Sequence, residues 1–346
     1  MYLSQVSKGR NNNLDIIRII AAVMVLFCHA FPISLGSSSH DWLAGLTNTQ
    51  ITFGNLAVCI FFCYAGFLIA GSLERNSSTS IFFKKRCIRL FPSLIVTVFL
   101  TTFIVGALLT QIPVKNYYLN TNTYKYLLNS ILIPVHSLPG VFENNVYGTA
   151  VNGSLWTLPV EFLCYILCLV FFLLKLNRKS IAKYTMILFF PVYVLLFSFL
   201  GEVPVLQSAL RPIGMFYIGV LLYIYREKVF LSEKCAVICG FILCVFAWLD
   251  KLEWVILPCL SYVLMYIGFG IKLPKNKFIE EYEISYQVYL LGFPVQQIIC
   301  QVFGGCMNPY VNFLLSVPVT CVLGLILYTT VDCKISLYLK RRKSEK

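Results

Sequence analysis

The chain has 346 residues, of which 58% are hydrophobic and only 12% are charged. Soluble domains carry about 25% charged residues, so this composition excludes a soluble globular enzyme, a disulfide-stapled secreted domain and a disordered chain. The mean hydropathy is +0.78. A net charge of +13 would indicate nucleic-acid binding in a soluble protein, and the positions of the charges decide whether that applies.

Ten apolar segments have about the length that a helix needs to cross a bilayer. A hydrocarbon core about 30 Å thick requires about 20 apolar residues. We therefore predict an all-α, polytopic integral membrane protein in which one domain occupies residues 1–346. The expected spans are 14–34, 53–73, 91–111, 152–174, 184–200, 207–225, 235–250, 254–271, 284–303 and 310–330. The first apolar segment, 14–34, is long and contains Arg18 and His29, so we expect no cleavable signal peptide.

The basic residues predict the orientation of these spans. With the N-terminus inside, 23 of the 28 Lys and Arg residues fall in inner segments and only three in outer loops. Cytoplasmic loops of membrane proteins are enriched in Lys and Arg, so the sequence predicts that both termini are inside. The net charge then reflects topology, the lipid bilayer is a partner, and nucleic acid is excluded as one.

The outer loop 112–151 is the longest connection, with 40 residues. Loops of this length usually have a function. Its tyrosines and asparagines suit contact with sugar rings, but they are also ordinary turn and interface residues, and both interpretations stay open. The stretch 124–133 is expected to form a short amphipathic helix along the interface. The residues concerned are Asn116, Tyr117, Tyr118, Asn120, Asn122, Tyr124 and Tyr126.

Metal and redox chemistry have little support in the sequence. The 14 cysteines lie mostly in apolar runs, and pairs such as Cys59 and Cys63 have the i, i+4 spacing of helix packing residues. No CxxC motif and no His/Cys zinc spacing occurs, so we expect no metal. The GxSxG, Walker, HExxH and GxGxxG motifs are absent as well.

Ionisable side chains inside membrane spans are costly and indicate functional sites. Here they are Arg18, His29, Glu161 and Arg211. Arg18 and His29 are 11 residues apart, which on a helix places them on one face about 16 Å apart along the axis. Neutral imidazole is a common general base, whereas the plainer alternative is a snorkelling Arg and a hydrogen-bonded core His.

Two further polar groups flank the spans. Arg86 and Arg89 have i, i+3 spacing at the inner end of a span, where two guanidinium groups suit a phosphate-bearing ligand; a positive-inside signal is the alternative. The segment 152–161 enters the membrane from outside and places Glu161 about 13 Å deep. A structural ion pair between Glu161 and Arg211 is the alternative there.

These residues occur in strings that together resemble the acyltransferase 3 family of integral membrane acyltransferases. The matching strings cover most of the chain in order. They are the first span with Arg18 and His29 (an Arg-x10-His signature), 54–69 (GNLAVCIFFCYAGFLI), 86–92 (RCIRLFP), 151–161 (VNGSLWTLPVE) and 284–297 (ISYQVYLLGFPVQQ).

The resemblance implies transfer of an acyl group, commonly acetyl from acetyl-CoA, to a hydroxyl of an extracytoplasmic or lipid-linked glycan. Acetyl-CoA is then a co-substrate, and no cofactor is permanently bound. Relatives of this kind acylate capsule, exopolysaccharide or O-antigen, which predicts a multi-pass protein of a bacterial cell membrane. The short C-terminal tail is similar to that of stand-alone members, and a homo-oligomer is compatible with the sequence.

The resemblance also implies roles for individual residues. His29 is expected to deprotonate the acceptor hydroxyl, with Arg18 orienting CoA or offsetting charge, and Arg86 and Arg89 are expected to bind the CoA phosphates. The catalytic group is completed by Glu161. The acceptor side is expected to involve Trp156, Asn152, Ser154, Asp41 and Tyr289.

One departure and two alternatives bear on this reading. Many relatives carry a second His near the position of Gly292, so no second catalytic His is assigned. A narrower alternative is acylation of a small molecule, or use of another donor such as succinyl-CoA. An alternative of another class is a transporter of glycan or lipid precursors, which the lack of internal repeats disfavours.

Overall fold

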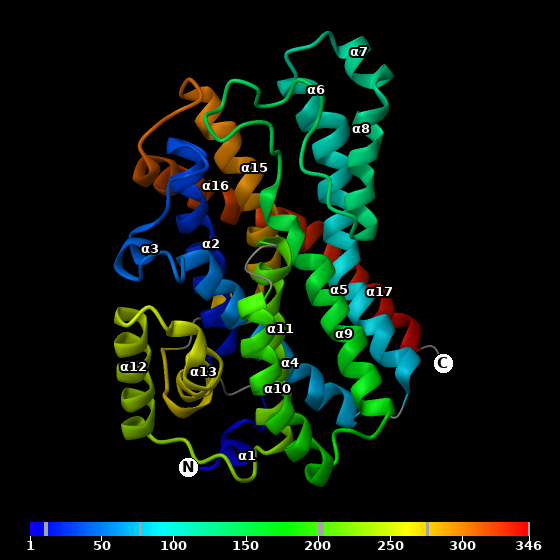
Figure 1. Ribbon diagram of the computed structural model, residues 1–346. Coiled ribbons are helices and arrows are strands. Elements are labelled where there is room, and N and C mark those ends of the chain that lie inside the picture. The colour runs from blue at the N-terminus through cyan, green and yellow to red at the C-terminus, as the bar shows by residue number, and fades with distance from the viewer. Residues whose placement is uncertain (10–12, 76–77, 200–203, 275–276, 345–346) are drawn as a thin grey trace. The chain divides into compact units, whose positions relative to one another are not determined.

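The computed structural model describes residues 1–9, 13–75, 78–199, 204–274 and 277–344, and within these ranges the chain is helical with no β-strand. It divides into two compact units, each built from separated stretches of sequence. Unit 1 comprises residues 1–21, 42–82 and 160–276, and unit 2 comprises 22–41, 83–159 and 277–346. Figure 1 shows the helices of both units coloured along the chain.

Unit 1 is organised around two helices, α4 (Phe53–Arg75) and α11 (Pro204–Ile224), which cross at glycines. A Cβ on Gly66 would lie 2.0 Å from the carbonyl oxygen of Phe216, and one on Gly219 would lie 2.2 Å from that of Cys63. Only a residue without a side chain allows two backbones to approach this closely. The helices of this unit include α1 (Leu3–Val6), α3 (Trp42–Leu46), α4 (Phe53–Arg75), most of α9 (Thr157–Leu173), α10 (Lys179–Phe199), α11 (Pro204–Ile224), α12 (Glu233–Trp248), η5 (Leu252–Trp254), η6 (Ile256–Leu260), α13 (Ser261–Met265) and η7 (Tyr266–Gly270).

Unit 2 has α15 (Ser285–Val302) at its centre, buried over most of its length and packed against α16 (Pro309–Leu327). The second half of α2 (Leu14–Leu35) also belongs to this unit. Its helices further include most of α5 (Thr79–Leu100), η1 (Thr101–Val105), α6 (Gly106–Leu109), α7 (Val114–Leu119), α8 (Thr121–Lys125), η2 (Tyr126–Ile131), η3 (Gly153–Trp156), α14 (Lys277–Glu281), α15 (Ser285–Val302), α16 (Pro309–Leu327), η8 (Tyr328–Asp332) and α17 (Cys333–Ser344).

The membrane assignment is confirmed by these helices. Six described helical stretches are long and apolar enough to cross a bilayer, and 208–224 and 256–270 are shorter apolar helices. Each of the ten predicted spans contains a helix, although residue 200 lies outside the described residues. The number of crossings and the inside location of both termini stay predictions. The six are Leu14–Leu35, Phe53–Arg75, Thr79–Leu109, Gly153–Leu173, Lys179–Phe199 and Pro309–Leu339.

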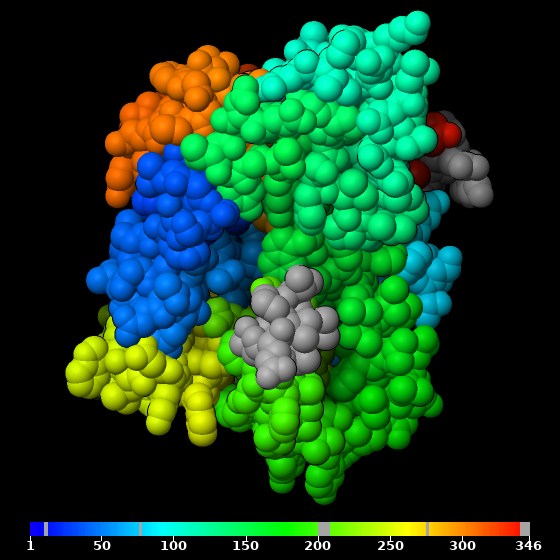
Figure 2. Space-filling view, turned by 45° about the horizontal axis from the view of Figure 1, so that its top comes forward, coloured from blue at the N-terminus to red at the C-terminus, as the bar shows by residue number. Residues whose placement is uncertain are grey.

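The predicted outer loop, residues 112–151, is folded rather than extended. Figure 2 shows it, in cyan to green, as a continuous surface. Tyr117 and Tyr118 donate hydrogen bonds of 2.6 and 2.7 Å to the carbonyls of Thr102 and Phe103 in η1. η1 is a π-helix, and the carbonyls of such an irregular turn need partners inside a membrane protein. Burial raises the pKa of Tyr117, so its phenol stays a donor.

The predicted helix over 124–133 is present in part. The segment forms α8 and then η2, and Asn120 begins α8 by accepting a hydrogen bond from the backbone N–H of Asn122 at 2.9 Å. Tyr124 donates to the Tyr118 carbonyl at 2.8 Å. Several of the aromatic and amide groups in the first half of the loop thus hold its own fold.

Candidate functional site

His29 lies in the part of α2 that belongs to unit 2, and its ring packs against a single aromatic side chain. The ring centroids of His29 and Phe293 are 5.1 Å apart at an interplanar angle of 73°. Phe293 is 1% exposed, whereas His29 is half-buried. Among the residues that the structure describes, none forms a hydrogen bond with the His29 ring. The imidazole is therefore positioned by ring packing, and its two nitrogens are available for hydrogen bonds to a ligand.

The position of Phe293 follows from a proline and a glycine nearby. Pro294 lies inside α15 and removes the N–H that would bond the Leu290 carbonyl. Asn152 fills that gap, because its Nδ2 donates to the Leu290 oxygen at 2.9 Å. The next residue, Gly153, lies so close to Phe293 that a Cβ there would approach the ring to 2.8 Å. The outer loop is thereby joined to α15 beside His29.

Three of the residues predicted on the acceptor side meet in one buried network. Ser154 donates to Asn152 Oδ1 at 2.7 Å, and Tyr289 donates its hydroxyl to the Ser154 carbonyl at 2.7 Å. The Tyr289 hydroxyl also lies 2.5 Å from Thr157 Oγ1. Asn152 and Ser154 are each 1% exposed. Their polar groups are used within the protein, so they frame the site, and direct contact with an acceptor stays a prediction.

The other predicted residues on the acceptor side are placed differently. Trp156 is half-buried and ends η3. Asp41 is buried at 1% exposure and directly precedes α3. Asp41 forms no hydrogen bond with His29 in the described structure, so the geometry does not show it orienting the imidazole, and its contact with an acceptor stays a prediction. Gly292 packs against Leu26 of α2.

Arg86 and Arg89 lie on α5 in unit 2, near three acidic or amide side chains that sequence analysis did not single out. Arg89 Nη2 lies 3.0 Å from Glu283 Oε1. Asp332 accepts hydrogen bonds from Gln287 Nε2 at 2.7 Å and from Ser93 Oγ. The candidate donor end therefore has a carboxylate, that of Glu283, which competes with a phosphate for Arg89.

Arg18 and Glu161 belong to unit 1. Arg18 lies on α2 with its Nη1 3.8 Å from Asp15 Oδ1, and its side chain is 13% exposed. Glu161 lies on α9 and accepts a hydrogen bond from the hydroxyl of Tyr165, one turn further on. α2 carries both Arg18 and His29, as expected. Their action as a pair stays a prediction.

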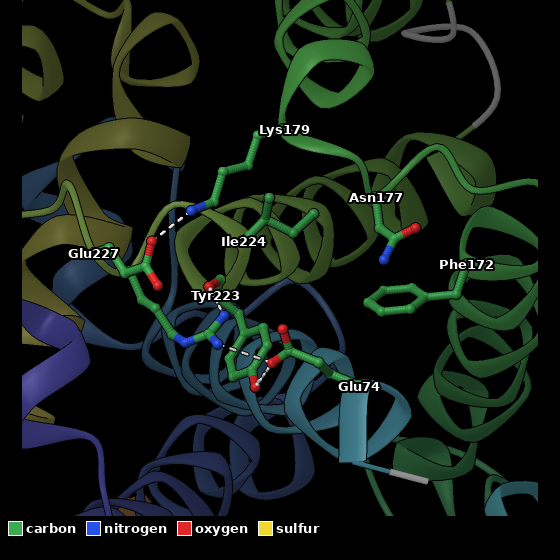
Figure 3. A pocket seen from close by; sticks show the side chains of 8 residues that line it. Glu74, Phe172, Asn177, Lys179, Tyr223, Ile224 and Glu227 are labelled. Atoms are coloured by element: carbon green, nitrogen blue, oxygen red, sulfur yellow. Dashed lines mark hydrogen bonds and ion pairs between the residues drawn. The ribbon is translucent and has the colours of Figure 1, made fainter. Parts of the chain in front are cut away.

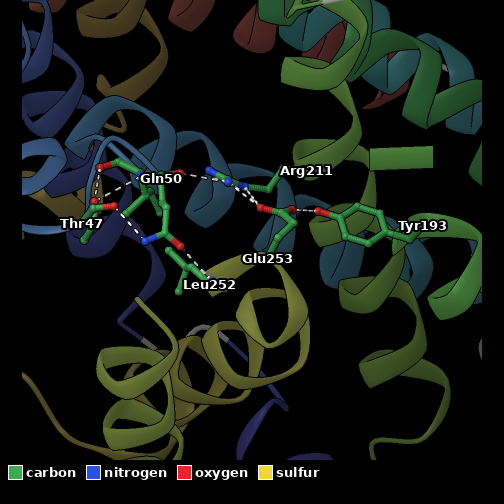
Figure 4. Close-up of polar contacts among 7 residues, drawn as sticks. Thr47, Gln50, Tyr193, Arg211, Leu252 and Glu253 are labelled. Atoms are coloured by element: carbon green, nitrogen blue, oxygen red, sulfur yellow. Dashed lines mark hydrogen bonds and ion pairs between the residues drawn. The ribbon is translucent and has the colours of Figure 1, made fainter. Parts of the chain in front are cut away.

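The alternative in which Arg211 pairs with Glu161 is wrong. Figure 4 shows Arg211 directed at Glu253, with Nη2 2.5 Å and Nε 3.0 Å from Oε2, and Tyr193 donating to the same carboxylate. Arg211 also donates to the Gln50 carbonyl at 3.0 Å. Both charged side chains are largely buried, so this pair satisfies itself inside unit 1.

Unit 1 also holds a polar pocket of about 100 Å³, seen in Figure 3. Its charges are paired: Lys179 with Glu227 at 2.5 Å, and Arg226 with Glu74 at 2.9 Å. The Lys179 ammonium lowers the pKa of Glu227. Because each cation already faces a carboxylate, we assign no ligand here. The lining consists of Glu74, Phe172, Asn177, Lys179, Tyr223, Ile224, Arg226 and Glu227.

These features define a helical membrane protein in which a histidine without a hydrogen-bond partner among the described residues lies beside a folded loop. A family model described as an acyltransferase domain, Acyl_transf_3, matches residues 11–330. The chain therefore belongs to the acyltransferase 3 family and is an integral membrane acyltransferase.

Two curated relatives support this placement. An "O-acetyl transferase" of Shigella phage Sf6 is 29% identical over 320 residues, which cover 89% of this chain and 90% of that protein. "Nodulation protein 10" of Rhizobium leguminosarum bv. viciae is 33% identical over 165 residues, or 46% of this chain and 44% of that protein. No solved structure matches the chain.

Proposed function

We propose that the protein transfers an acetyl group from cytoplasmic acetyl-CoA to a hydroxyl of an extracytoplasmic or lipid-linked glycan. The observation that carries this proposal is the similarity to a phage O-acetyl transferase along 89% of the chain. The open imidazole of His29 gives the reaction its base. Capsule, exopolysaccharide and O-antigen are the acceptor classes that we favour, and the membrane is that of a bacterial cell.

The proposed reaction assigns one proton transfer to His29. The imidazole accepts the proton of the acceptor hydroxyl while the hydroxyl oxygen attacks the thioester carbonyl. The carbon–sulfur bond then breaks, and the leaving CoA thiolate takes up the proton from the His29 imidazolium, which restores the neutral base. The described residues leave the His29 nitrogens without a hydrogen-bond partner, which suits a base whose partner arrives with the acceptor.

The donor is assigned to the end of unit 2 that carries Arg86 and Arg89. Guanidinium groups bind phosphate oxygens by charge-assisted hydrogen bonds. Arg18 and Glu161, both in unit 1, keep the catalytic roles that the resemblance implies, in which Arg18 offsets charge on CoA. No resident cofactor or metal is proposed, and among the described residues no group of three His, Cys, Asp or Glu side chains is arranged to hold a metal ion.

The test is release of free CoA by the purified protein in nanodiscs, with acetyl-CoA as donor and a cell-envelope glycan fraction as acceptor. Glycan-stimulated release, together with acetyl ester on the recovered glycan, is the expected result. Release with succinyl-CoA but not acetyl-CoA would replace the donor. Absence of both CoA binding and CoA release would instead favour a transporter.

A further inference from the structure

Residues 144–151, at the end of the outer loop, lie against the same aromatic ring that holds His29. The Tyr147 and Phe293 centroids are 5.5 Å apart with rings at 71°. Phe293 also contacts the His29 ring, at 5.1 Å. A single buried ring therefore lies against both the proposed base and Tyr147. None of the strings that indicated the site included Tyr147.

A set of amide hydrogen bonds fixes this segment on α15. Asn145 Nδ2 donates to the side-chain and backbone oxygens of Gln297 at 2.8 and 3.0 Å. Gln297 Nε2 donates to the carbonyl of Ala150 at 2.7 Å. Gln297 is fully buried, and Asn145 is 5% exposed. The two amides thus clamp both sides of Tyr147 to the helix that carries Phe293.

The loop after α15 provides a second attachment. The backbone N–H of Val146 donates to the Gly305 carbonyl at 2.9 Å. Gly305 has φ +89°, and a Cβ there would lie 2.3 Å from the Asn144 carbonyl oxygen. Only glycine allows this conformation and this approach. The backbone on either side of Tyr147 is therefore determined by contacts outside its own loop.

Tyr147 itself keeps its hydroxyl group unused. It is half-buried, and in the described structure its hydroxyl makes no hydrogen bond, whereas those of Tyr117, Tyr118 and Tyr124 each bond to a backbone carbonyl. A buried Tyr hydroxyl ordinarily finds a partner. The Tyr126 hydroxyl also makes no hydrogen bond among the described residues, but Tyr126 is 1% exposed. Tyr147 is therefore the tyrosine of this loop that combines an unused hydroxyl with an accessible side chain.

Two buried amide oxygens close to this point also lack a partner among the described residues. They are Asn145 Oδ1 and Gln296 Oε1. Gln296 is fully buried and uses its Nε2 to donate to the Leu26 carbonyl at 2.8 Å, one turn of α2 before His29. Both oxygens are closed to solvent, so they are not contact groups for a ligand, but buried acceptors without a partner are uncommon in proteins.

We propose that Tyr147 contacts the acceptor and determines acceptor specificity, presenting its ring and hydroxyl to the apolar face and hydroxyl groups of a sugar ring whose reacting hydroxyl lies at His29. The proposal rests on the proposed function, since it requires a glycan acceptor. Asn145 and Gln297 are positioning residues in this scheme. They act through Tyr147 by holding the segment on α15.

The test compares Tyr147→Leu, Tyr147→Phe and wild type in the CoA-release assay with the cell-envelope glycan fraction, whose concentration is given as total hexose. Tyr147→Leu should raise the half-saturating glycan concentration about 3- to 10-fold, as expected for loss of an aromatic contact. The kcat and the binding of acetyl-CoA measured without glycan should stay near wild type. Tyr147→Phe keeps the ring and should show a smaller rise.

Tyr124→Leu is the control for the fold of the loop, because it removes an exposed tyrosine whose hydroxyl bonds the Tyr118 carbonyl. It should leave the glycan dependence unchanged. An unchanged half-saturating concentration in Tyr147→Leu, or a loss confined to kcat, would overturn the proposal while leaving the acyltransferase function intact. A wild type that releases no CoA with any glycan would overturn both. If Tyr147→Leu fails to accumulate, the other two variants test the proposal. A Tyr147→Phe protein with wild-type acetyl-CoA binding and no change in glycan dependence overturns the role of the hydroxyl. A Tyr147→Trp protein with wild-type acetyl-CoA binding and no change in glycan dependence overturns the role of the ring.

Discussion

The Asn152 side chain has two structural roles: it supplies a hydrogen bond that α15 lacks because of Pro294, and it holds residues of the candidate site in place. Proline inside a membrane helix leaves a carbonyl that lipid cannot satisfy. Asn152 supplies the missing donor to the Leu290 carbonyl, while its Oδ1 accepts from the Ser154 backbone N–H at 3.1 Å and from the Ser154 hydroxyl at 2.7 Å. Because Phe293 directly precedes Pro294, the same repair positions the ring that holds His29.

Substituting this residue should therefore reduce both stability and activity. Asn152→Leu is expected to lower the midpoint of thermal unfolding in detergent, since leaving the buried Leu290 carbonyl unpaired costs about 1–3 kcal/mol. Thermal unfolding followed by tryptophan fluorescence measures the shift. Asn122→Leu, at an exposed position of the loop 112–151, is the control and should shift the midpoint far less. Equal shifts in the two variants would contradict the account.

Among individual residues, the sequence indicated the proposed base, His29, but not the aromatic residues around it. His29 is recognisable because an ionisable group inside an apolar run is costly. Phe293 and Tyr147 carry no such signal, since an aromatic residue in a span or loop is ordinary. The contact between them depends on tertiary hydrogen bonds of Gln297 and Asn145, which a single sequence does not encode in any periodic pattern.

At the scale of elements, the ten apolar runs predicted the helices well but excluded two charged residues that lie just beyond their ends. One predicted span begins at residue 254, directly after Glu253. Another ends at residue 330, two residues before Asp332. Both carboxylates are turned toward polar partners, Glu253 toward Arg211 and Asp332 toward Gln287. A window chosen for apolar content stops before such residues, although packing places them within the protein.

The outer loop was harder to interpret, because its composition fits two uses. Tyr117 and Tyr118 complete the hydrogen bonding of a π-turn in the preceding helix. That turn has no sequence signature of its own within the apolar run 101–105. Composition therefore indicated that the loop mattered, but only the fold separates the tyrosines that support it from the one beside His29.

The ion pair at the end of α5 leads to a prediction for the proposed donor site. Glu283 occupies Arg89 at 3.0 Å with both side chains partly exposed. A phosphate that binds Arg89 must displace the Glu283 carboxylate. Glu283→Gln should therefore lower the Kd for CoA about 2- to 5-fold, because exposed ion pairs are worth about 0.2–1 kcal/mol.

Equilibrium binding of CoA to the purified protein at low salt measures this effect. Glu280→Gln removes the same charge three residues earlier, on α14, and should change the Kd less. Weaker binding in Glu283→Gln would mean that the carboxylate orients Arg89 for the phosphate instead of competing with it.

At the scale of the whole molecule, composition alone established a membrane protein, and the order of five short strings indicated its family. The closest approach of helices within unit 1 was not predictable in the same way. The glycines of α4 and α11 that permit it, Gly66 and Gly219, look in the sequence like any other glycine of an apolar run. Helix periodicity fixes which residues share a face but not which faces meet.

The predicted topology can be tested with cysteines that the chain already contains. Cys306 is exposed in the loop between α15 and α16, and Cys235 is exposed near the start of α12. With both termini inside, a membrane-impermeant maleimide should label Cys306 but not Cys235 in intact cells. Mass spectrometry of the labelled peptides distinguishes them, and Cys306→Ser is the control. Labelling of Cys235 with Cys306 protected would reverse the orientation.

The central claim is that His29 is the general base of an acyl transfer. The most direct measurement is glycan-stimulated CoA release from acetyl-CoA by wild type, His29→Ala and the exposed-histidine control His40→Ala. His29→Ala should lose at least about 100-fold in kcat, the usual contribution of a general base, with CoA binding intact and His40→Ala near wild type. A His29→Ala protein that retains near-normal turnover would contradict the account.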